Sequence, residues 1–308
     1  MLSVARNARL AATTTASRRR RNSASTISVE PCIKCAGEPV VPPSPATSAA
    51  AHTPTAEDRL PYEDEGVMRS TFYRRPLPEH LVAFDSADGK KLFRRCLDAG
   101  HAEGYFHLAG NFASQSEPAY CGPSSLAMVL NALQIDPRRR WKGAWRWYTD
   151  ELLEGCLPLS VIKRKGITFS QFACMASGHC EVEAKRPEDH SYEEFMADLR
   201  RVTSRTDNGE HMVVSYARAT LGQTGDGHFS PVGSFCPTPT AKDPQGGAVL
   251  VLDVARFKYP SYFCHTRMLY EATKPLDRTT GKSRGWFLLR PRKNSPVYGC
   301  ASVCKDWA

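Results

Sequence analysis

The 308-residue sequence lacks any apolar run that approaches the roughly 20 residues needed to span a bilayer. It also lacks a secretory signal with an apolar central region, and it contains no internal repeat. These absences predict a chain that has no membrane span and is either soluble or peripheral to a membrane. The hydrophobic content of 41% is sufficient for a large buried core.

Signatures of nucleic-acid binding are also missing. The net charge of +9 invites that interpretation, but the sequence has no zinc-finger spacing, no RNA-recognition signature and no basic helix with base-reading residues. Much of the positive charge lies in short clusters, among them 18–21, 138–140 and 163–165. A small acidic substrate explains a basic surface at least as well, so no nucleic-acid partner is expected.

The eleven cysteines do not form a compact disulfide framework, which favours free thiols in a reducing compartment. Two close pairs near the termini resemble half of a zinc site, Cys32/Cys35 and Cys300/Cys304. Each lacks a second pair nearby, so a closed tetrahedral zinc site is not supported. Cys174 and Cys180, with His179 between them, are weak candidate metal ligands, and structural thiols are the alternative.

The N-terminus is short of acidic residues, since none precedes Glu30. Arginines among Ala, Ser and Thr are typical of an organellar transit peptide, and a disordered basic tail is the alternative. A Pro-, Ala-, Ser- and Thr-rich stretch over 38–55 then predicts a linker. We therefore expect an extension over residues 1–70 and one catalytic domain over 71–308, located in the cytoplasm, mitochondrion or plastid.

Against these absences, one cysteine stands at the start of a predicted helix over 122–133. Apolar residues repeat there at helical spacing, and Pro123 suits the first helical position. A thiol at a helix N-terminus is stabilised as the thiolate by the helix dipole and unpaired N–H groups, so Cys121 is a candidate nucleophile. The alternative is a buried structural cysteine. The side-chain amide of Gln115 could stabilise an oxyanion.

Helices are expected in the first half of the region and strands in the second. A helix over 90–99 ends before Gly100, and the segment 191–194 has the pattern of a capping box. Short β-branched or aromatic runs predict four strands, over 212–216, 229–235, 248–254 and 286–289. This order indicates the α+β fold class.

A histidine and an aspartate complete a candidate catalytic set. His228 opens a strand after a Gly-rich loop, where a general base would be held firmly. Asp253 interrupts an apolar run, and a buried carboxylate is costly unless it is paired, so an imidazole on the neighbouring strand is its natural partner. Cysteine, histidine and aspartate then supply nucleophile, base and orienting group. Asp226 and Asp243 are less credible orienting groups because they lie in flexible loops.

Four segments, 114–122, 165–169, 222–231 and 252–260, resemble the phytochelatin synthases, which are glutathione γ-glutamylcysteinyltransferases. The resemblance extends over about 72–307. It implies a papain-like cysteine protease fold, in which a helical part carrying the nucleophile packs on an antiparallel sheet carrying the histidine and aspartate. The resemblance implies that the family's catalytic positions are occupied here by Cys121, His228, Asp253 and Gln115. It implies that the substrate-binding positions are occupied by Arg256, Tyr259 and Gly227.

The implied reaction makes phytochelatins from glutathione. The thiol attacks the Cys–Gly bond, glycine leaves, and the amine of a second glutathione or of a phytochelatin accepts the γ-Glu-Cys group. No organic cofactor is implied. Cd²⁺ or another thiophilic metal stimulates the family, at least partly as metal–glutathione thiolates, and a homodimer is compatible with it. A peptidase that removes glycine from glutathione or its S-conjugates is one alternative, and a non-catalytic thiol-rich metal-binding protein is another.

Two departures from the family pattern stand out. The turn between His228 and Asp253 is longer than is usual in the family and carries Cys236. Extra residues in a hairpin loop cost little free energy, so the pairing of the two strands need not change. Eukaryotic members also continue into a cysteine-rich C-terminal region, whereas this sequence stops near Cys304.

Overall fold

The computed structural model describes residues 72–153, 155 and 157–292. The predicted extension over 1–70 and the two terminal cysteine pairs lie outside the described residues. Within the described ranges, no helix is both long and apolar enough to cross a membrane.

The described strands form one seven-stranded sheet in which all neighbours are antiparallel. The strands are β1 (Val82–Ala83), β2 (Glu181–Lys185), β3 (His211–Ala217), β4 (Gly227–Pro237), β5 (Gly247–Val251), β6 (Tyr262–His265) and β7 (Gly285–Arg290). Their order across the sheet is β1-β6-β5-β4-β3-β7-β2, so β4 lies at the centre. A bulge interrupts the β4–β5 register between Val232 and Ser234.

Helices precede most of the sheet in the chain, as the sequence predicts. They are α2 (Ala87–Asp98), α3 (Glu103–Gly110), α4 (Cys121–Ala132), α5 (Leu159–Lys165), α6 (Phe169–Ser177), α7 (Tyr192–Ser204) and α8 (Thr266–Glu271), with 3-10 turns η3 (Asp150–Leu152) and η4 (Arg218–Leu221). The α+β class is therefore confirmed, with helices packed on an antiparallel sheet.

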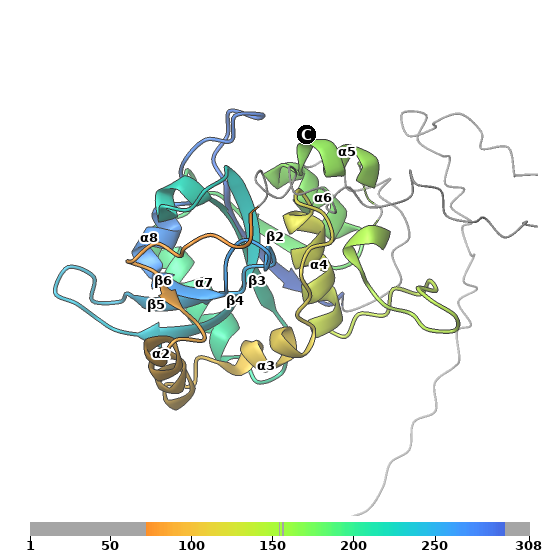
Figure 1. Cartoon of the computed structure of the whole chain (residues 1–308). Coiled ribbons are helices and arrows are strands. Elements are labelled where there is room, and N and C mark those ends of the chain that lie inside the picture. Colours follow the sequence, from red (N-terminus) through yellow and green to blue (C-terminus); the bar gives the residue numbers. More distant parts are fainter. Residues whose placement is uncertain (1–71, 154, 156, 293–308) are drawn as a thin grey trace, which may run out of the picture. The chain divides into compact units, whose positions relative to one another are not determined.

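Each face of the sheet is covered by its own set of helices (Figure 1). Successive strand residues point to opposite faces, and β7 shows the consequence. Phe287 and Leu289 join a core with α2 to α6, whereas Trp286 and Leu288 join a second core with α7 and α8. Both faces of β7 are buried, and this accounts for its near-continuous run of apolar residues.

Local sequence signals at helix ends are largely confirmed. Helix α2 ends before Gly100, which has a positive φ of 69°. Ser191 and Glu194 form the expected capping box at the start of α7. One expectation is wrong in detail, because Pro123 is the third helical residue rather than the first. That position is still tolerated, since the first four helical N–H groups have no partner within the helix.

Helix α4 lies on the sheet, and nearly all of its surface is covered. Every one of its residues except Cys121 is buried, so the helix is fixed on all sides and only its first residue reaches open space. Gly122 permits the closest contact, since a β-carbon there would lie 2.4 Å from Cγ2 of Ile167. Any larger residue at this position would push α4 away from its neighbours.

Candidate active site

A cleft of about 900 Å³ opens beside the N-terminus of α4. Gln115, Cys121, Gly227 and His228 line it, so the structure brings four of the predicted site residues to one cavity. The hydroxyl of Tyr120, the residue before Cys121, donates a hydrogen bond to the carbonyl oxygen of Leu159 at 3.1 Å. This bond ties the start of α4 to the start of α5 on the far side of the cleft.

The imidazole and the carboxylate form a direct pair. Nε2 of His228 lies 2.9 Å from Oδ1 of Asp253. The other ring nitrogen, Nδ1, is left for Cys121, which lines the same cleft and whose pKa His228 lowers. Asp253 lies two residues beyond the end of β5 rather than within the strand, and the backbone N–H of Ala255 also donates to its Oδ1 at 2.9 Å.

A buried arginine holds the carboxylate from the other side. Nη2 of Arg218 donates to Oδ1 of Asp253 at 3.0 Å, and Nη1 lies 2.9 Å from Oδ2 as an ion pair. Both side chains are at most 3% exposed. Nη1 also donates to Oε1 of Gln223 at 2.5 Å, and the guanidinium lies 5.2 Å from the ring centre of Tyr259. Charge-assisted bonds of this kind are stronger than neutral ones.

Two hydrogen bonds connect the chain around Cys121 to the strand that carries His228 and to the segment that carries Asp253. The hydroxyl of Ser125 in α4 donates to the carbonyl oxygen of Phe229, directly after the histidine, at 3.0 Å. The backbone N–H of Gln115 donates to the carbonyl oxygen of Val254, directly after the aspartate, at 3.0 Å. The three elements are therefore connected to one another next to the reacting groups, which is the preorganisation that catalysis requires.

The site favours a charged cysteine–histidine pair. Burial opposes thiolate formation at Cys121, but the charge and hydrogen bond of His228, the N–H of Phe229 and the charge of Arg218 together lower its pKa. Burial and Arg218 oppose protonation of His228, but Asp253 and Cys121 outweigh them and raise its pKa. His228 and Arg218 outweigh the burial of Asp253 and hold the pKa of its carboxyl far below the usual range.

No other free cysteine in the described residues has a lowered pKa. Burial raises the pKa of both Cys96 and Cys180 to about 12, and it also raises the pKa of Cys236 and Cys264. The thiolate is the reactive form of cysteine, so the structure marks Cys121 as the reactive thiol of this set. These four cysteines behave as the structural thiols that the sequence analysis weighed as an alternative.

We therefore expect iodoacetamide to alkylate Cys121 at pH 6 to 7, where the buried thiols stay protonated. Each pKa unit changes the thiolate fraction about tenfold below the pKa, so Cys121 should react at least about tenfold faster than Cys180. Peptide mass mapping after timed quenching measures the rates site by site, with the unfolded chain as the control in which they converge. A Cys121 reaction that begins only near pH 9 would contradict the lowered pKa.

Gln115 lines the cleft and is largely buried, but its amide hydrogens are already engaged. Nε2 donates to the carbonyl oxygens of Glu117 and Pro118, at 2.8 and 2.9 Å, while Oε1 has no hydrogen-bond partner among the described residues. The side chain therefore shapes the turn before Cys121. Nε2 could donate to an oxyanion only if one of these two hydrogen bonds broke. The oxyanion role of Gln115 therefore stays a prediction.

Arg256 and Tyr259, expected near the substrate carboxylates, are both engaged outside the lining of the cleft. The guanidinium of Arg256 faces the ring of Phe112 at 5.5 Å and donates to Ser261 at 3.2 Å. The buried hydroxyl of Tyr259 accepts the N–H of Thr224 at 2.9 Å and so fixes the Gly-rich loop. Direct contact of these two side chains with substrate stays a prediction.

Other cations line the cleft instead. Arg164 and Lys165 at the end of α5 are exposed, and Lys258 is half-buried. Burial and the neighbouring charge of Arg218 lower the pKa of Lys258, so a bound carboxylate would stabilise its charged form. Arg284 also lines the cleft, but it is paired with Asp226 at 2.8 Å. The cleft thus presents positive charge to an acidic ligand.

The candidate metal ligands are not gathered into a metal site. Cys174, in α6, is disulfide-bonded, contrary to the expectation that the cysteines are free thiols, and is not available as a thiolate ligand. The thiol of Cys180 donates to the carbonyl oxygen of Ala176 at 3.4 Å. Within the described part of the chain, no group of three or more His, Cys, Asp or Glu side chains is arranged to hold a metal ion.

Sequence reasoning missed two buried polar residues. Arg218 follows the apolar strand β3, and an arginine directly after such a run could have drawn notice. Asp150 accepts the N–H of Ser116 at 2.8 Å and the hydroxyl of Ser124, and it thereby clamps the loop before Cys121 to the first turn of α4. Nothing in its sequence surroundings signals that contact.

The described residues thus form an α+β protein with a cysteine, a histidine and an aspartate arranged in series at one cleft. A sequence model of the phytochelatin synthase family matches residues 72–286, and the chain belongs to that family. It is 42% identical over 231 residues to a glutathione gamma-glutamylcysteinyltransferase of Schizosaccharomyces pombe, with 75% of this chain and 54% of the relative covered.

Plant relatives are similar to the same degree. Glutathione gamma-glutamylcysteinyltransferase 1 of Arabidopsis thaliana is 42% identical over 241 residues, covering 77% of this chain and 47% of the relative. Glutathione gamma-glutamylcysteinyltransferase 1 of Triticum aestivum is 43% identical over 231 residues, covering 74% and 44%. The chain spans about half the length of these relatives.

Proposed function

We propose that this chain is a γ-glutamylcysteinyl transferase that makes phytochelatins from glutathione through a thioester on Cys121. The observation that carries the proposal is the cleft that Cys121 and His228 line together, in which Asp253 holds Nε2 of the imidazole. The names of the relatives describe the same transfer. We further propose a papain-like arrangement, in which α4 carries the nucleophile against the sheet that carries the base.

In the first half-reaction, the Cys121 thiolate attacks the carbonyl carbon of the Cys–Gly bond of glutathione. The C–N bond breaks, His228 gives its Nδ1 proton to the departing glycine amine, and a γ-Glu-Cys thioester remains. The backbone N–H groups of Cys121 and Gly122 come before Pro123 and have no partner within α4, so they would be the donors to the developing oxyanion. Asp253 stabilises the imidazolium before the proton moves.

In the second half-reaction, the α-amine of another glutathione or of a phytochelatin attacks the thioester. Neutral His228 takes the amine proton at Nδ1, and Cys121 leaves as the thiolate. A new amide bond replaces the thioester, so the cycle needs no outside energy source. Positive side chains at the cleft, including Lys165 and Lys258, would attract the acceptor carboxylates.

We propose that Cd²⁺ enters this reaction on the substrate, as a glutathione thiolate complex. Each glutathione carries two carboxylates and one ammonium group, so a complex of Cd²⁺ with two thiolates is an anion. Such an anion suits the cations of the cleft, and the metal would block the substrate thiol from competing reactions. The role is therefore that of heavy-metal detoxification by peptide synthesis.

Product analysis by mass spectrometry tests the transferase. With glutathione and Cd²⁺, we expect free glycine and (γ-Glu-Cys)₂-Gly. S-methylglutathione should give the corresponding S-methylated product without any metal, because its thiol is already blocked. Release of γ-Glu-Cys and glycine alone would instead identify a peptidase. No product under either condition, together with stoichiometric metal binding, would favour a non-catalytic metal-binding protein.

The oxyanion role of Gln115 makes a separate prediction. If its amide exchanges a bond to reach the oxyanion, Gln115→Ala should lower kcat by about 100-fold, the usual effect of losing one such donor. If it only shapes the turn, the variant should mainly lower the melting temperature. Steady-state kinetics and thermal unfolding of the same preparation separate the two, with Lys90→Ala at an exposed position of α2 as the control.

A further inference from the structure

The segment that follows α4, the Trp-basic loop (136–147), carries a high concentration of tryptophan and positive charge. Every residue over 138–147 is exposed, and this stretch contains three tryptophans, four arginines, one lysine and no acidic residue. Trp145 is 77% exposed, and Trp141 and Trp147 are 36% and 43% exposed. Figure 1 shows this part of the chain as a yellow-green loop that extends from the end of α4.

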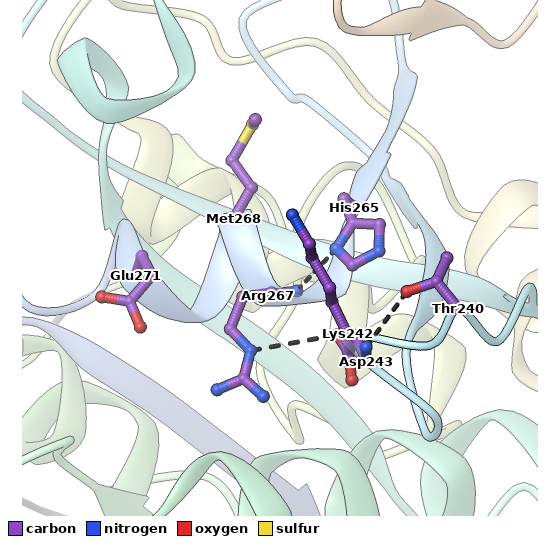
Figure 2. Close-up of a pocket in the computed structure, with 7 residues that line it drawn as sticks. All are labelled: Thr240, Lys242, Asp243, His265, Arg267, Met268 and Glu271. Carbon is purple, nitrogen blue, oxygen red and sulfur yellow. Dashed lines mark hydrogen bonds and ion pairs between the residues drawn. The ribbon is translucent and has the colours of Figure 1, made fainter.

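One carboxylate opposes the five cations of the Trp-basic loop. Asp136 accepts Nε of Arg146 at 2.9 Å and the backbone N–H of Arg138 at 2.8 Å, and the loop contains no second acidic residue. The pocket between the β4–β5 loop and α8 differs, because cations and carboxylates line it together (Figure 2). The Trp-basic loop therefore keeps a net positive charge, which complements an anionic partner.

The Trp-basic loop has a defined backbone. The N–H of Trp145 donates to the carbonyl oxygen of Lys142 at 2.9 Å, and the N–H of Trp141 donates to the carbonyl oxygen of Trp145 at 2.7 Å. Directly after the loop, the buried Tyr148 exchanges two backbone hydrogen bonds with the side chain of Asn131 in α4, at 2.9 and 3.2 Å. The exposed tryptophans thus lie on a turn that is anchored to the end of α4.

Tryptophan and basic side chains in one exposed loop suit the interface of an anionic membrane. Tryptophan is enriched there because its ring is apolar and its N–H is polar, and cations are attracted to anionic lipids. Consecutive exposed residues form a projecting surface, which does not enclose a small ligand. Single-stranded nucleic acid would need open aromatic faces for stacking, but the Lys142 ammonium covers one face of Trp141, at 4.7 Å from the ring centre.

We propose that the Trp-basic loop attaches this protein peripherally to an anionic lipid surface. The tryptophan rings lie at the level of the lipid headgroups, and the cations face the lipid phosphates and carboxylates. Apolar and electrostatic contributions add in such an attachment, which is reversible. Helix α4 is about 18 Å long and carries Cys121 at its other end. Among the residues that the structure describes, none of the loop lines the catalytic cleft, so lipid bound there does not block the cleft directly.

Vesicle sedimentation of the full-length protein tests the proposal. With about 30% phosphatidylserine in phosphatidylcholine, we expect saturable binding at about 0.1 M NaCl. Binding should be at least about tenfold weaker in pure phosphatidylcholine or at about 0.5 M NaCl. The triple variant Arg138→Ala, Arg140→Ala and Lys142→Ala should bind about 100-fold more weakly, because each cation near the lipid surface contributes about fivefold. Equal binding to vesicles with and without phosphatidylserine would contradict the proposal.

A matched control removes the same charge from exposed positions outside the loop, with Lys90→Ala, Arg94→Ala and Lys242→Ala. This triple variant should bind the vesicles within about threefold of the wild type, since its cations lie away from the lipid surface. Both triple variants should keep the melting temperature within a few degrees, because all the substituted residues are exposed. Equal losses of binding in the two variants would show a response to net charge alone and overturn the proposal.

The tryptophans give a second readout. Trp145→Ala combined with Trp147→Ala should weaken vesicle binding at least about tenfold, and brominated lipids should quench the fluorescence of the wild type more than that of this variant. Binding that survives both sets of loop substitutions would place the contact on another basic segment, such as 18–21, and overturn the proposal. Tighter binding to single-stranded RNA than to vesicles, lost in the same variants, would assign the loop to nucleic acid instead.

Discussion

Replacing Cys121 with serine is expected to lower the rate of glycine release from glutathione by about 10⁴-fold or more, the scale of losing a covalent nucleophile. Serine keeps the size of the side chain, but its hydroxyl has a far higher pKa than the thiol. The interaction with His228 that lowers the cysteine pKa would therefore not yield an alkoxide. Helix α4 should be unaffected, because Cys121 is its one residue that is not buried.

The measurement is the initial rate of glycine formation, followed by mass spectrometry with and without Cd²⁺. Thermal unfolding of the variant should match that of the wild type within a few degrees. Cys264→Ala is the matched control, because that thiol is buried in the other core and its pKa is raised. It should cost stability but keep kcat within about threefold. More than a tenth of the activity in Cys121→Ser would exclude the thioester on this residue.

Chemical patterns in the sequence predicted the centre of the site well. A thiol before an apolar helix is stabilised as the thiolate by the helix N-terminus, and an aspartate within an apolar run is costly unless it has a partner. That cost is local, so it can be recognised without knowing the fold. The structure places these groups together, with Nε2 of His228 at 2.9 Å from Asp253. The α+β class followed in the same way from the order of helical and strand patterns.

Residues whose role depends on a long-range contact were harder to predict. The family resemblance implied that Arg256, three residues after Asp253, binds substrate, and nothing in the sequence indicated that its guanidinium lies 5.5 Å from the ring centre of Phe112. Trp141, Trp145 and Trp147 are spaced as on one face of a helix, but they lie in a non-helical segment, and Trp145 is 77% exposed. Spacing along the chain does not specify which side of a loop faces the protein.

Arg218 shows why a buried charge is the most difficult case. From the sequence, an arginine after a strand is most simply a solvated residue at a loop. The structure buries it because Asp253 is buried too, and each charge offsets the desolvation of the other. Burial alone would lower the pKa of the guanidinium, but its partners outweigh burial and raise it. The burial of Arg218 can therefore be explained only together with the burial of Asp253.

We expect Arg218→Met to lower the free energy of unfolding at pH 7 by about 3–5 kcal/mol, because it leaves the Asp253 carboxylate buried without its main partner besides His228. Asp253 has a depressed pKa in the folded wild type, so its stabilisation is present above the unfolded pKa of about 3.9 and is lost as pH falls further. In the variant the pKa of Asp253 should rise. The stability difference should therefore shrink as pH falls and protonation neutralises the stranded carboxylate.

Urea unfolding of wild type and variant between pH 7 and pH 4 measures this difference. Arg218→Lys keeps the charge without the two-pronged geometry and should recover only part of the loss. The exposed Arg278→Met is the matched control and should change stability by less than about 0.5 kcal/mol. Activity should also fall in Arg218→Met, with an altered pH profile, because Asp253 then holds His228 less firmly. A stability loss that is equal at pH 7 and pH 4 would show that Arg218 acts by packing alone.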